Sequence, residues 1–330
     1  MHESTSRIIN FVKTLSQILA MDEIINTHIE KLDENYSPLF MHLNEGKKLY
    51  LGDKNAATCR FCKRSEPEVH FKQDTHALPE FTGNKYLFSY YECDDCNQKF
   101  SVLESNMAEY MKLYHTMAQV KGKKGVPSFK PNMQQNSRID VREDKVNIQI
   151  HEGDDFSFII NKASKVIHLN GTRTYVPSLV FKCLTKMALT IMPEKELVNF
   201  VETMEWVYSD KKILKKLPPV LFHVYAGIKP FDFITCALFK RKAAHKESVP
   251  YMMFMLAYSN FVFQLPVISK EMDMESTDMN FYYIPTPIDL EQGKIIREIL
   301  DLSSEERKVR ESCSINMGYE WLEELNDSQK

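Results

Sequence analysis

Two Cys-x-x-Cys pairs decide the local fold of this chain: "CRFC" at Cys59–Cys62 and "ECDDCNQKF" at Glu92–Phe100. Two such pairs bring four thiolates around one Zn²⁺ in tetrahedral geometry, and zinc stays redox-silent in a reducing cell. We therefore predict a structural zinc site formed by Cys59, Cys62, Cys93 and Cys96. A four-sulfur site has no open position for water, so this ion folds the segment and performs no chemistry.

The asparagine directly behind the second pair, Asn97, needs a separate explanation. Between the pairs, "EVHFKQDTHALP" has strand character and places His76 near its end, and "LPEFTGNK" is predicted to be a loop. From about Asp94 onward, apolar residues recur at helical spacing. The zinc would join the strand to the helix, so that His76 and Asn97 face each other across a short gap. Alternatively, Asn97 is only a polar residue in the first helical turn.

The segment from Cys59 to Phe100 resembles the HNH endonucleases of the ββα-metal class, in "CRFC", "DTHALPEFTGNK" and "CDDCNQKF". It is most similar to members whose finger is held by four cysteines. The resemblance implies a zinc-stapled ββα finger in which His76 is the general base and Asn97 binds a catalytic Mg²⁺ or Mn²⁺. Phosphodiester hydrolysis suits such a pair, because histidine titrates near neutral pH and a hard cation neutralises phosphate charge.

The sequence departs from the family pattern directly before the expected base. Thr75 stands where these enzymes usually have a metal-binding Asp, Glu or His, and Asp74 lies one residue further back. Neighbouring residues of a strand point to opposite faces, so Asp74 should point away from Thr75 unless the strand bends. The sequence therefore leaves three alternatives for the second ligand of the catalytic cation: Thr75, Asp74 or a further carboxylate. The candidates for that carboxylate are Glu80, Glu92, Asp94 and Asp95.

Three residues of the finger are candidate substrate contacts. Asn84 is a plausible counterpart of the middle asparagine of the family pattern, at an early position. Lys85 and Lys99 can reach phosphates or simply face solvent.

Composition limits the general class of protein. The chain has 330 residues, 43% of them hydrophobic, and a formal net charge of −3. The length favours two domains. The small net charge means that no overall electrostatic attraction draws the chain to nucleic acid or to an anionic membrane. We find no apolar run long enough to span a membrane and no signal-peptide pattern, and expect a cytoplasmic protein with reduced thiols. The three cysteines outside the pairs are expected to be buried apolar residues; they are Cys183, Cys236 and Cys313.

The predicted fold class is α+β, with four chain ranges. We expect an N-terminal helical segment at 1–50, because apolar residues from Arg7 to Leu43 fall at helical spacing. An HNH-like ββα domain at 51–120 and a Gly-, Pro- and Lys-containing linker at 121–137 follow. Residues 138–330 form a larger α+β domain for substrate selection, sensing or oligomerisation. The apolar face of the N-terminal helix either docks on the rest of the chain or pairs with a second copy. The second alternative would give a homodimer.

Patterns within 138–330 predict its elements. Alternating residues from Arg138 indicate strands, with a turn at Asn170-Gly171, and a helical stripe follows. Pro193 is expected to begin a second helix. Three later runs read as strands, two of them joined by a hairpin at Ser259-Asn260, and the tail from about Leu290 is predicted to be helical.

The sequence supports two classes of function. The first is a metal-dependent endonuclease acting on DNA, which family association places in antiphage defence with a possible partner protein. Two basic stretches then either contact the nucleic-acid backbone or are solvated; they contain Lys211, Lys212, Lys215 and Lys216, and Lys240, Arg241, Lys242 and Lys246. The second is a non-catalytic zinc-finger module that binds nucleic acid or a protein partner, which the threonine at position 75 favours.

Overall fold

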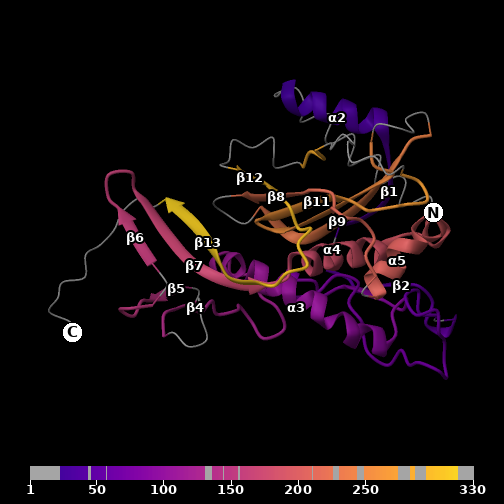
Figure 1. The fold of residues 1–330 in the computed structure, drawn as a ribbon, viewed down its shortest axis with the longest axis horizontal. Coiled ribbons are helices and arrows are strands. Elements are labelled where there is room, and N and C mark those ends of the chain that lie inside the picture. The colour runs from indigo at the N-terminus through magenta and orange to yellow at the C-terminus, as the bar shows by residue number, and fades with distance from the viewer. Residues whose placement is uncertain are drawn as a thin grey trace.

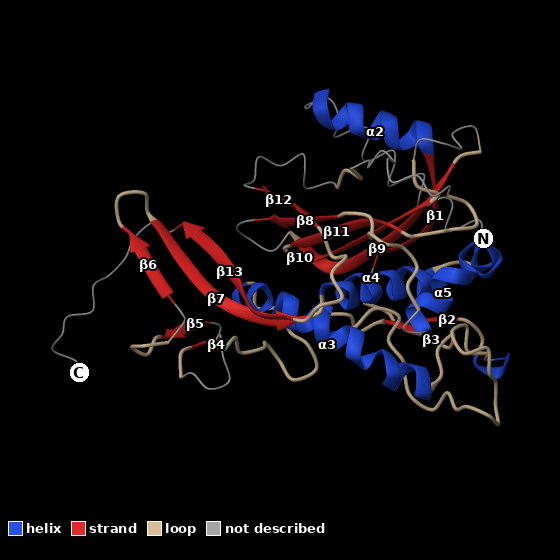
Figure 2. Cartoon of the chain, viewed as in Figure 1, coloured by secondary structure: helices blue, strands red, loops and turns tan. Residues whose placement is uncertain are grey.

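The computed structural model describes residues 23–43, 46–56, 58–130, 136–143, 145–154, 157–209, 211–225, 230–243, 249–273, 283–286 and 295–318. Within these ranges the chain is a mixed α+β protein, which confirms the predicted fold class (Figures 1 and 2). The start of the predicted N-terminal helical segment, residues 1–22, lies outside the described residues. None of the described helices is long and apolar enough to cross a lipid bilayer.

An antiparallel six-stranded sheet forms the centre of the molecule, in the order β1-β9-β10-β11-β8-β12. Its strands are β1 (Tyr36–Leu43), β8 (Val220–Tyr225), β9 (Phe231–Arg241), β10 (Met252–Ser259), β11 (Phe261–Pro266) and β12 (Ile295–Leu300). The central strands β10 and β11 are buried along their whole length. In Figure 1, α2 (Glu23–Asn35) lies on one side of this sheet and the other helices lie on the opposite side.

The helical layer consists of α3 (Asp94–Met117), α4 (Pro177–Ile191) and α5 (Val201–Tyr208), with a 3-10 turn at Glu194–Phe200 before α5. These elements confirm the helical stripe and the second helix after Pro193. Pro177 occupies the first turn of α4, where its missing N–H costs nothing. Helix α4 packs directly against α3 and is buried along nearly all of its length. It therefore lies between the sheet and the segment that contains the cysteine pairs.

The remaining strands form smaller sheets. Strands β6 (Ser157–Asn161), β7 (Val166–Tyr175) and β13 (Lys308–Gly318) form a three-stranded sheet with β7 in the middle. A hairpin is formed by β4 (Arg138–Arg142) and β5 (Lys145–Gln149), and a short parallel pair by β2 (Leu49–Leu51) and β3 (Leu87–Ser89). The range predicted as a linker is tied to β4, because Phe129 is buried and pairs with Ile139.

Three local predictions were wrong, and strand pairing explains each. The helical prediction to Leu43 fails at β1, which pairs with β9, and the predicted helical tail contains β12 and β13, which pair with β8 and β7. Asn170-Gly171 lies inside β7 and not in a turn, because β7 has a partner strand on both sides. Backbone pairing with a distant strand outweighs local propensity. The hairpin at Ser259-Asn260 is confirmed, with Ser259 at φ 52°.

One continuous hydrophobic core joins the cysteine-rich segment to the rest of the chain. Cys59 and Phe100 belong to the same buried cluster as Val180 on α4 and Phe254 on β10. The chain ranges that the sequence separates as finger and C-terminal domain thus share a core. The three remaining cysteines are buried, as expected; they are Cys183, Cys236 and Cys313.

Two polar contacts fix the cysteine-rich segment on α4. Lys186 on α4 forms an ion pair with Glu92 at 2.7 Å, and both side chains are at most 1% exposed. Arg60 donates through Nη1 to the carbonyl oxygens of Leu189 and Thr190 at the end of α4. Carbonyl groups in the last turn of a helix lack hydrogen-bond donors within the helix, and the guanidinium group of Arg60 donates to two of them.

We expect Lys186→Met to lower the free energy of unfolding by about 3–5 kcal/mol, because it leaves the buried Glu92 carboxylate without its cation. Chemical denaturation followed by circular dichroism measures this change. The matched control is Lys212→Met, whose ion pair with Glu305 is largely exposed and contributes less than about 1 kcal/mol. Equal losses in the two variants would contradict the anchoring role of Lys186.

Candidate functional site

The cysteine-rich segment contains a short extended stretch at His76, which an isolated bridge joins to strand β3, and helix α3 follows. Thr75–Ala77 pairs antiparallel with β3: Ser89 N donates to Thr75 O at 2.9 Å, and Ala77 N donates to Leu87 O at 3.1 Å. Between them, His76 and Phe88 form a bridge pair. Helix α3 begins shortly after β3, so the order is extended stretch, loop, strand, helix. This ββα unit (residues 59–117) is called the finger below.

The four paired cysteines converge on one point. Their Sγ atoms all lie within 4.8 Å of one another, and Cys62 Sγ lies 3.7 Å from Cys93 Sγ. Tetrahedral zinc with Zn–S bonds of about 2.3 Å requires sulfur–sulfur distances of roughly 3.8 Å. The group therefore fits a structural zinc ion, as the spacing predicts.

The four thiols also influence the protonation of one another. The hydrogen bond from Cys96 lowers the pKa of Cys59 to about 4, whereas burial raises the pKa of Cys93 to about 12. Four neighbouring thiolates repel one another, so all four ionise together only around a positive ion. The site ties the turn before the strand to the first turn of α3, because Cys96 lies in that helix.

The loop between the two finger strands is closed by Asn84. This side chain is fully buried; its Nδ2 donates to Leu78 O at 2.7 Å and to Leu87 O at 2.8 Å. Its Oδ1 accepts from the backbone N–H groups of Tyr86 and Leu87. The amide is thus used within the loop, and Asn84 has no surface through which to touch a substrate. The expectation of a substrate contact does not fit its position, whereas Lys85 beside it is exposed.

His76 lies at the end of the first finger strand, half-buried, with its ring centroid 4.7 Å from that of Phe88. Burial lowers the pKa of this imidazole below its usual value of 6.5, although the charges of Glu80 and Asp74 act in the opposite direction. The ring is therefore mostly neutral at pH 7 and can accept a proton.

Thr75 and Asp74 differ in burial. Thr75 is 3% exposed, and its Oγ1 is buried without a hydrogen-bond partner among the described residues. Asp74 is exposed and acts on the charge of His76. A buried hydroxyl without a partner is costly, which makes Thr75 Oγ1 an atom that a cation would satisfy.

The contacts of the other candidate carboxylates differ from one another. Glu92 is buried in the ion pair with Lys186, and burial raises its pKa to about 7. Asp95 is exposed and lies 3.4 Å from Arg64. Neither faces His76 in these contacts. Glu80, at the start of the loop, is the largest electrostatic influence on His76 after burial.

The start of α3 is tied to the segment that precedes His76. The carboxylate of Asp94 accepts the backbone N–H groups of Lys72 and Gln73, at 3.2 and 3.1 Å. Asn97 Nδ2 donates to Gln73 Oε1 at 3.1 Å. Asn97 therefore contacts the chain three residues before His76. This bond uses the amide nitrogen of Asn97, whereas a hard cation takes the carbonyl oxygen.

Several of the remaining cationic candidates are engaged locally. Lys99 Nζ lies 3.8 Å from the ring centroid of Tyr208, in a cation–π contact. In the two basic stretches, Lys211 and Lys240 pair with Glu205 and Glu196. Lys246 lies outside the described residues.

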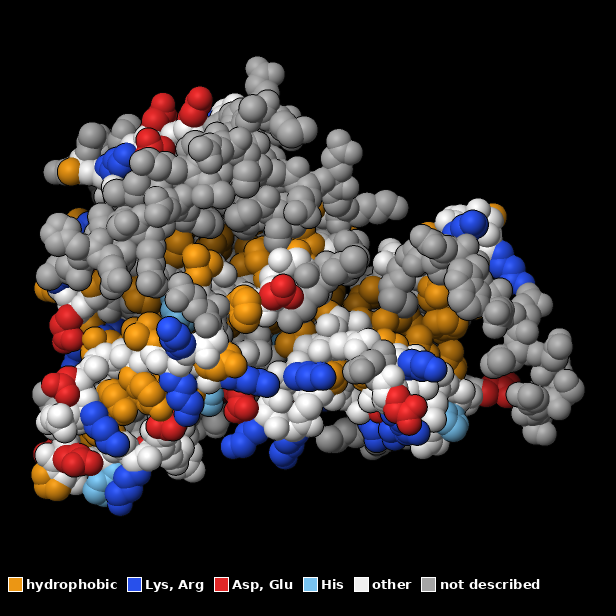
Figure 3. Space-filling model, turned by 180° about the vertical axis from the view of Figure 1, so that it is seen from behind, with side chains coloured by type: hydrophobic (Ala, Val, Ile, Leu, Met, Phe, Trp, Pro, Cys, Tyr) orange, Lys and Arg blue, Asp and Glu red, His pale blue; other side chains and the backbone are white. Residues whose placement is uncertain are grey.

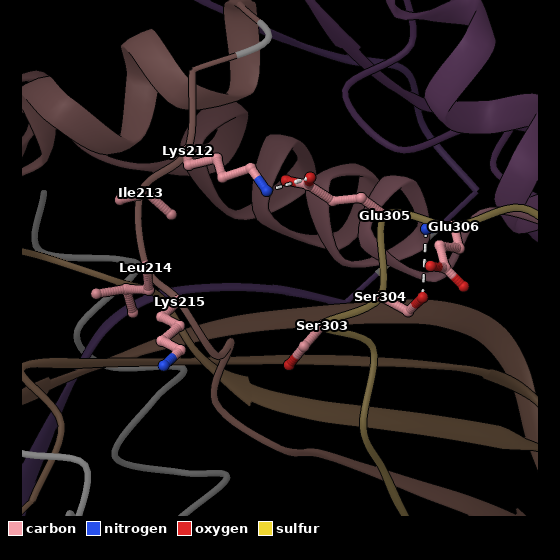
Figure 4. A pocket seen from close by; sticks show the side chains of 8 residues that line it. All are labelled: Lys212, Ile213, Leu214, Lys215, Ser303, Ser304, Glu305 and Glu306. Carbon is pink, nitrogen blue, oxygen red and sulfur yellow. Dashed lines mark hydrogen bonds and ion pairs between the residues drawn. The ribbon is translucent and has the colours of Figure 1, made fainter.

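Lys212 borders a surface pocket of about 600 Å³ that is lined by residues 212–215 and 303–306 (Figure 4). Its ammonium group reaches Glu305 there, at 2.6 Å. The pocket lies between the segment after α5 and the segment after β12, and none of the finger residues discussed above lines it. The finger itself shows hydrophobic side chains bordered by Lys and Arg, at the lower left of Figure 3.

Comparison with known proteins gives one match. Residues 59–106 match the family model described as HNH endonuclease, and this range contains the zinc-site cysteines, His76 and Asn97. No curated protein and no solved structure matches the chain. HNH endonucleases hydrolyse phosphodiester bonds in nucleic acid, and the four-cysteine group is typical of members whose finger is held by zinc. Residues 59–106 of this chain are therefore an HNH endonuclease domain.

Proposed function

We propose that the protein is a divalent-metal-dependent endonuclease that cuts DNA, with His76 as the general base. The observation that carries this proposal is the state of His76: a half-buried imidazole at the end of the finger strand, with its pKa lowered by burial. A neutral imidazole accepts the proton of the attacking water as the phosphate is attacked. The ring contact with Phe88 limits the orientations that the imidazole can adopt.

The residues around His76 suit a hard divalent cation. Asn97 offers a carbonyl oxygen, Thr75 a buried hydroxyl oxygen without a partner, and Asp74 and Glu80 offer carboxylates. Mg²⁺ and Mn²⁺ prefer such oxygen ligands and keep open positions for water and phosphate. When bound, the cation neutralises charge on the scissile phosphate and on the leaving oxygen. We propose Asn97 and Thr75 as ligands, with Asp74 or Glu80 supplying negative charge.

The alternative function is a non-catalytic zinc-finger module that binds nucleic acid or a protein. Thr75 in place of the usual carboxylate favours it, because a threonine hydroxyl binds a divalent cation more weakly than a carboxylate does. Four further proposals rest on family association or on the sequence alone. They are a role in antiphage defence, a cytoplasmic location, a homodimer and a defence partner. The nuclease proposal is stronger because it also uses the protonation state of His76.

We expect His76→Ala to reduce cleavage of supercoiled plasmid in Mg²⁺ or Mn²⁺ by roughly 10²-fold or more, because the general base is lost. Gel analysis of nicked and linear products measures the rate. His70→Ala is the matched control, since His70 is exposed and its ring makes only a 4.0 Å contact with Glu66. Thermal unfolding and zinc content should match the wild type in both variants. Unchanged cleavage by the His76 variant would contradict its role as the general base, whereas no cleavage by the wild type would support the binding-module function.

The pH dependence of cleavage should reflect the lowered pKa of His76. A base must be unprotonated to act, so the rate falls as pH drops through its pKa. Because burial holds that pKa below 6.5, the rate should still exceed half of its maximum at pH 6.5 and fall to half only at lower pH. Initial rates in buffers of constant ionic strength measure the profile. A rate that halves above pH 6.5 would contradict the buried-imidazole assignment.

Removal of zinc should unfold the finger. We expect one zinc ion per chain by elemental analysis, and Cys59→Ser should lose zinc and lower the melting temperature, because one of the four thiolates is gone. Cys313→Ser is the control, since Cys313 lies on β13 outside the cluster. Full zinc content in the Cys59 variant would show that this thiolate is not a ligand.

A further inference from the structure

A row of aromatic side chains extends from His76 across one face of the strand pair β2–β3. Tyr50 and Phe88 are register partners in the parallel pair β2–β3, and Phe88 is the bridge partner of His76 on its other side. Register partners point to the same face of a sheet, so these three side chains share one face. Tyr90 lies two residues beyond Phe88 and continues the pairing, since its N–H donates to Leu51 O at 2.8 Å.

The rings contact one another in sequence. The centroid of Phe88 lies 4.7 Å from that of His76 and 5.0 Å from that of Tyr50, with Phe88 and Tyr50 inclined by 20°. Tyr50 in turn stacks on Tyr90 at 5.1 Å and 13°. We call these four residues the aromatic row: His76, Phe88, Tyr50 and Tyr90.

The aromatic row lies outside the hydrophobic core. Leu87 and Leu51, on the opposite face of the same strands, pack in the main core, whereas Phe88 belongs to none of the core clusters although it is only 4% exposed. Tyr50 and Tyr90 keep part of their surface in solvent. The row therefore does not fill space between the finger and the rest of the chain, and Tyr50 and Tyr90 provide ring surface that solvent reaches.

Two exposed lysines accompany the row. Lys48 Nζ lies 5.1 Å from the ring centroid of Phe88, and Lys54 Nζ lies 6.0 Å from that of Tyr90. Gly52, between them, has a φ of +90°, and a Cβ there would lie 2.9 Å from the ring of Tyr91. Only glycine fits this sharp turn, which returns the chain so that Lys54 reaches Tyr90.

We propose that the aromatic row, with Lys48 and Lys54, binds unpaired nucleotides of the substrate beside the bond cut at His76. Aromatic rings combined with nearby cations bind single-stranded nucleic acid, because bases stack on the rings and lysines contact phosphates. Bases inside a duplex are stacked on one another and do not reach such rings. The preferred substrates are therefore single strands, flaps or bubbles. This inference rests on the proposed nuclease function and specifies its substrate class.

The test compares binding of single-stranded and duplex DNA to the full chain. Fluorescence anisotropy uses a labelled oligothymidine of about 20 nucleotides and a duplex of the same length, without added divalent ions so that cleavage does not proceed. We expect Tyr50→Ala and Tyr90→Ala each to weaken single-strand binding by roughly 5-fold or more, with duplex binding unchanged. Tyr90→Phe should retain single-strand affinity. Phe233→Ala, which removes an exposed ring on β9, should change neither.

The lysine contribution has its own readout. Lys54→Gln should reduce the slope of log affinity against log salt concentration by about 0.7 for the single strand, because one phosphate contact is lost. Melting temperatures of all variants separate lost binding from lost folding. If Tyr50→Ala unfolds, Tyr90→Ala decides the outcome, because Tyr90 lies at the end of the row and is half-exposed.

Two results would overturn the inference: unchanged single-strand affinity in Tyr90→Ala, or an equal loss of single-strand and duplex affinity. Because binding is measured without cleavage, this outcome is independent of the His76→Ala experiment. If the tyrosine variants bind normally while His76→Ala abolishes cleavage, the nuclease function is supported and the aromatic row is not the binding surface. If His76→Ala cleaves normally while the tyrosine variants lose single-strand affinity, the binding surface stands without the proposed catalysis.

Discussion

The convergence of four thiol groups on one point is the constraint on which the finger depends. A strand pair and a helix of this size bury little surface by themselves, and Cys59, Cys62, Cys93 and Cys96 join their ends. The cluster sets where α3 begins relative to the first finger strand. The bonds of Asp94 and Asn97 to the chain at Lys72 and Gln73 follow from that placement. The contact between Asn97 and Gln73, three residues before His76, thus lies next to the sulfur cluster.

The finger is also inseparable from the rest of the molecule. Glu92 directly precedes Cys93 and holds Lys186 of α4, while Arg60 directly follows Cys59 and binds the carbonyl groups at the end of α4. Two residues next to metal ligands therefore attach the finger to a helix that packs under the central sheet. A buried ion pair adds little net stability, but loss of one partner is costly, so the docking is specific. Movement of α4 relative to the sheet would therefore also move the four-cysteine cluster.

Its half-buried position beside Phe88 gives His76 two properties at once. It lowers the pKa of the imidazole, which keeps the ring neutral near pH 7, and it connects the ring to Tyr50 and Tyr90. The proposed base and the proposed binding surface are therefore parts of one sheet face. Asp74 and Glu80 act on His76 in the opposite direction, so a cation that neutralises them would lower the pKa of His76 further.

The sequence by itself determined the sulfur group and the helix of the finger, because Cys-x-x-Cys spacing and the helical period after Cys93 are local patterns. Only the tertiary structure decided that β1, β12 and β13 are strands, since their pairing partners lie far away in the chain. It also decided that Asn84 closes a loop, that Glu92 is buried against Lys186, and that Tyr50 joins the row beside His76. Each of these depends on which distant backbone lies alongside, and no local spacing in the sequence encodes that.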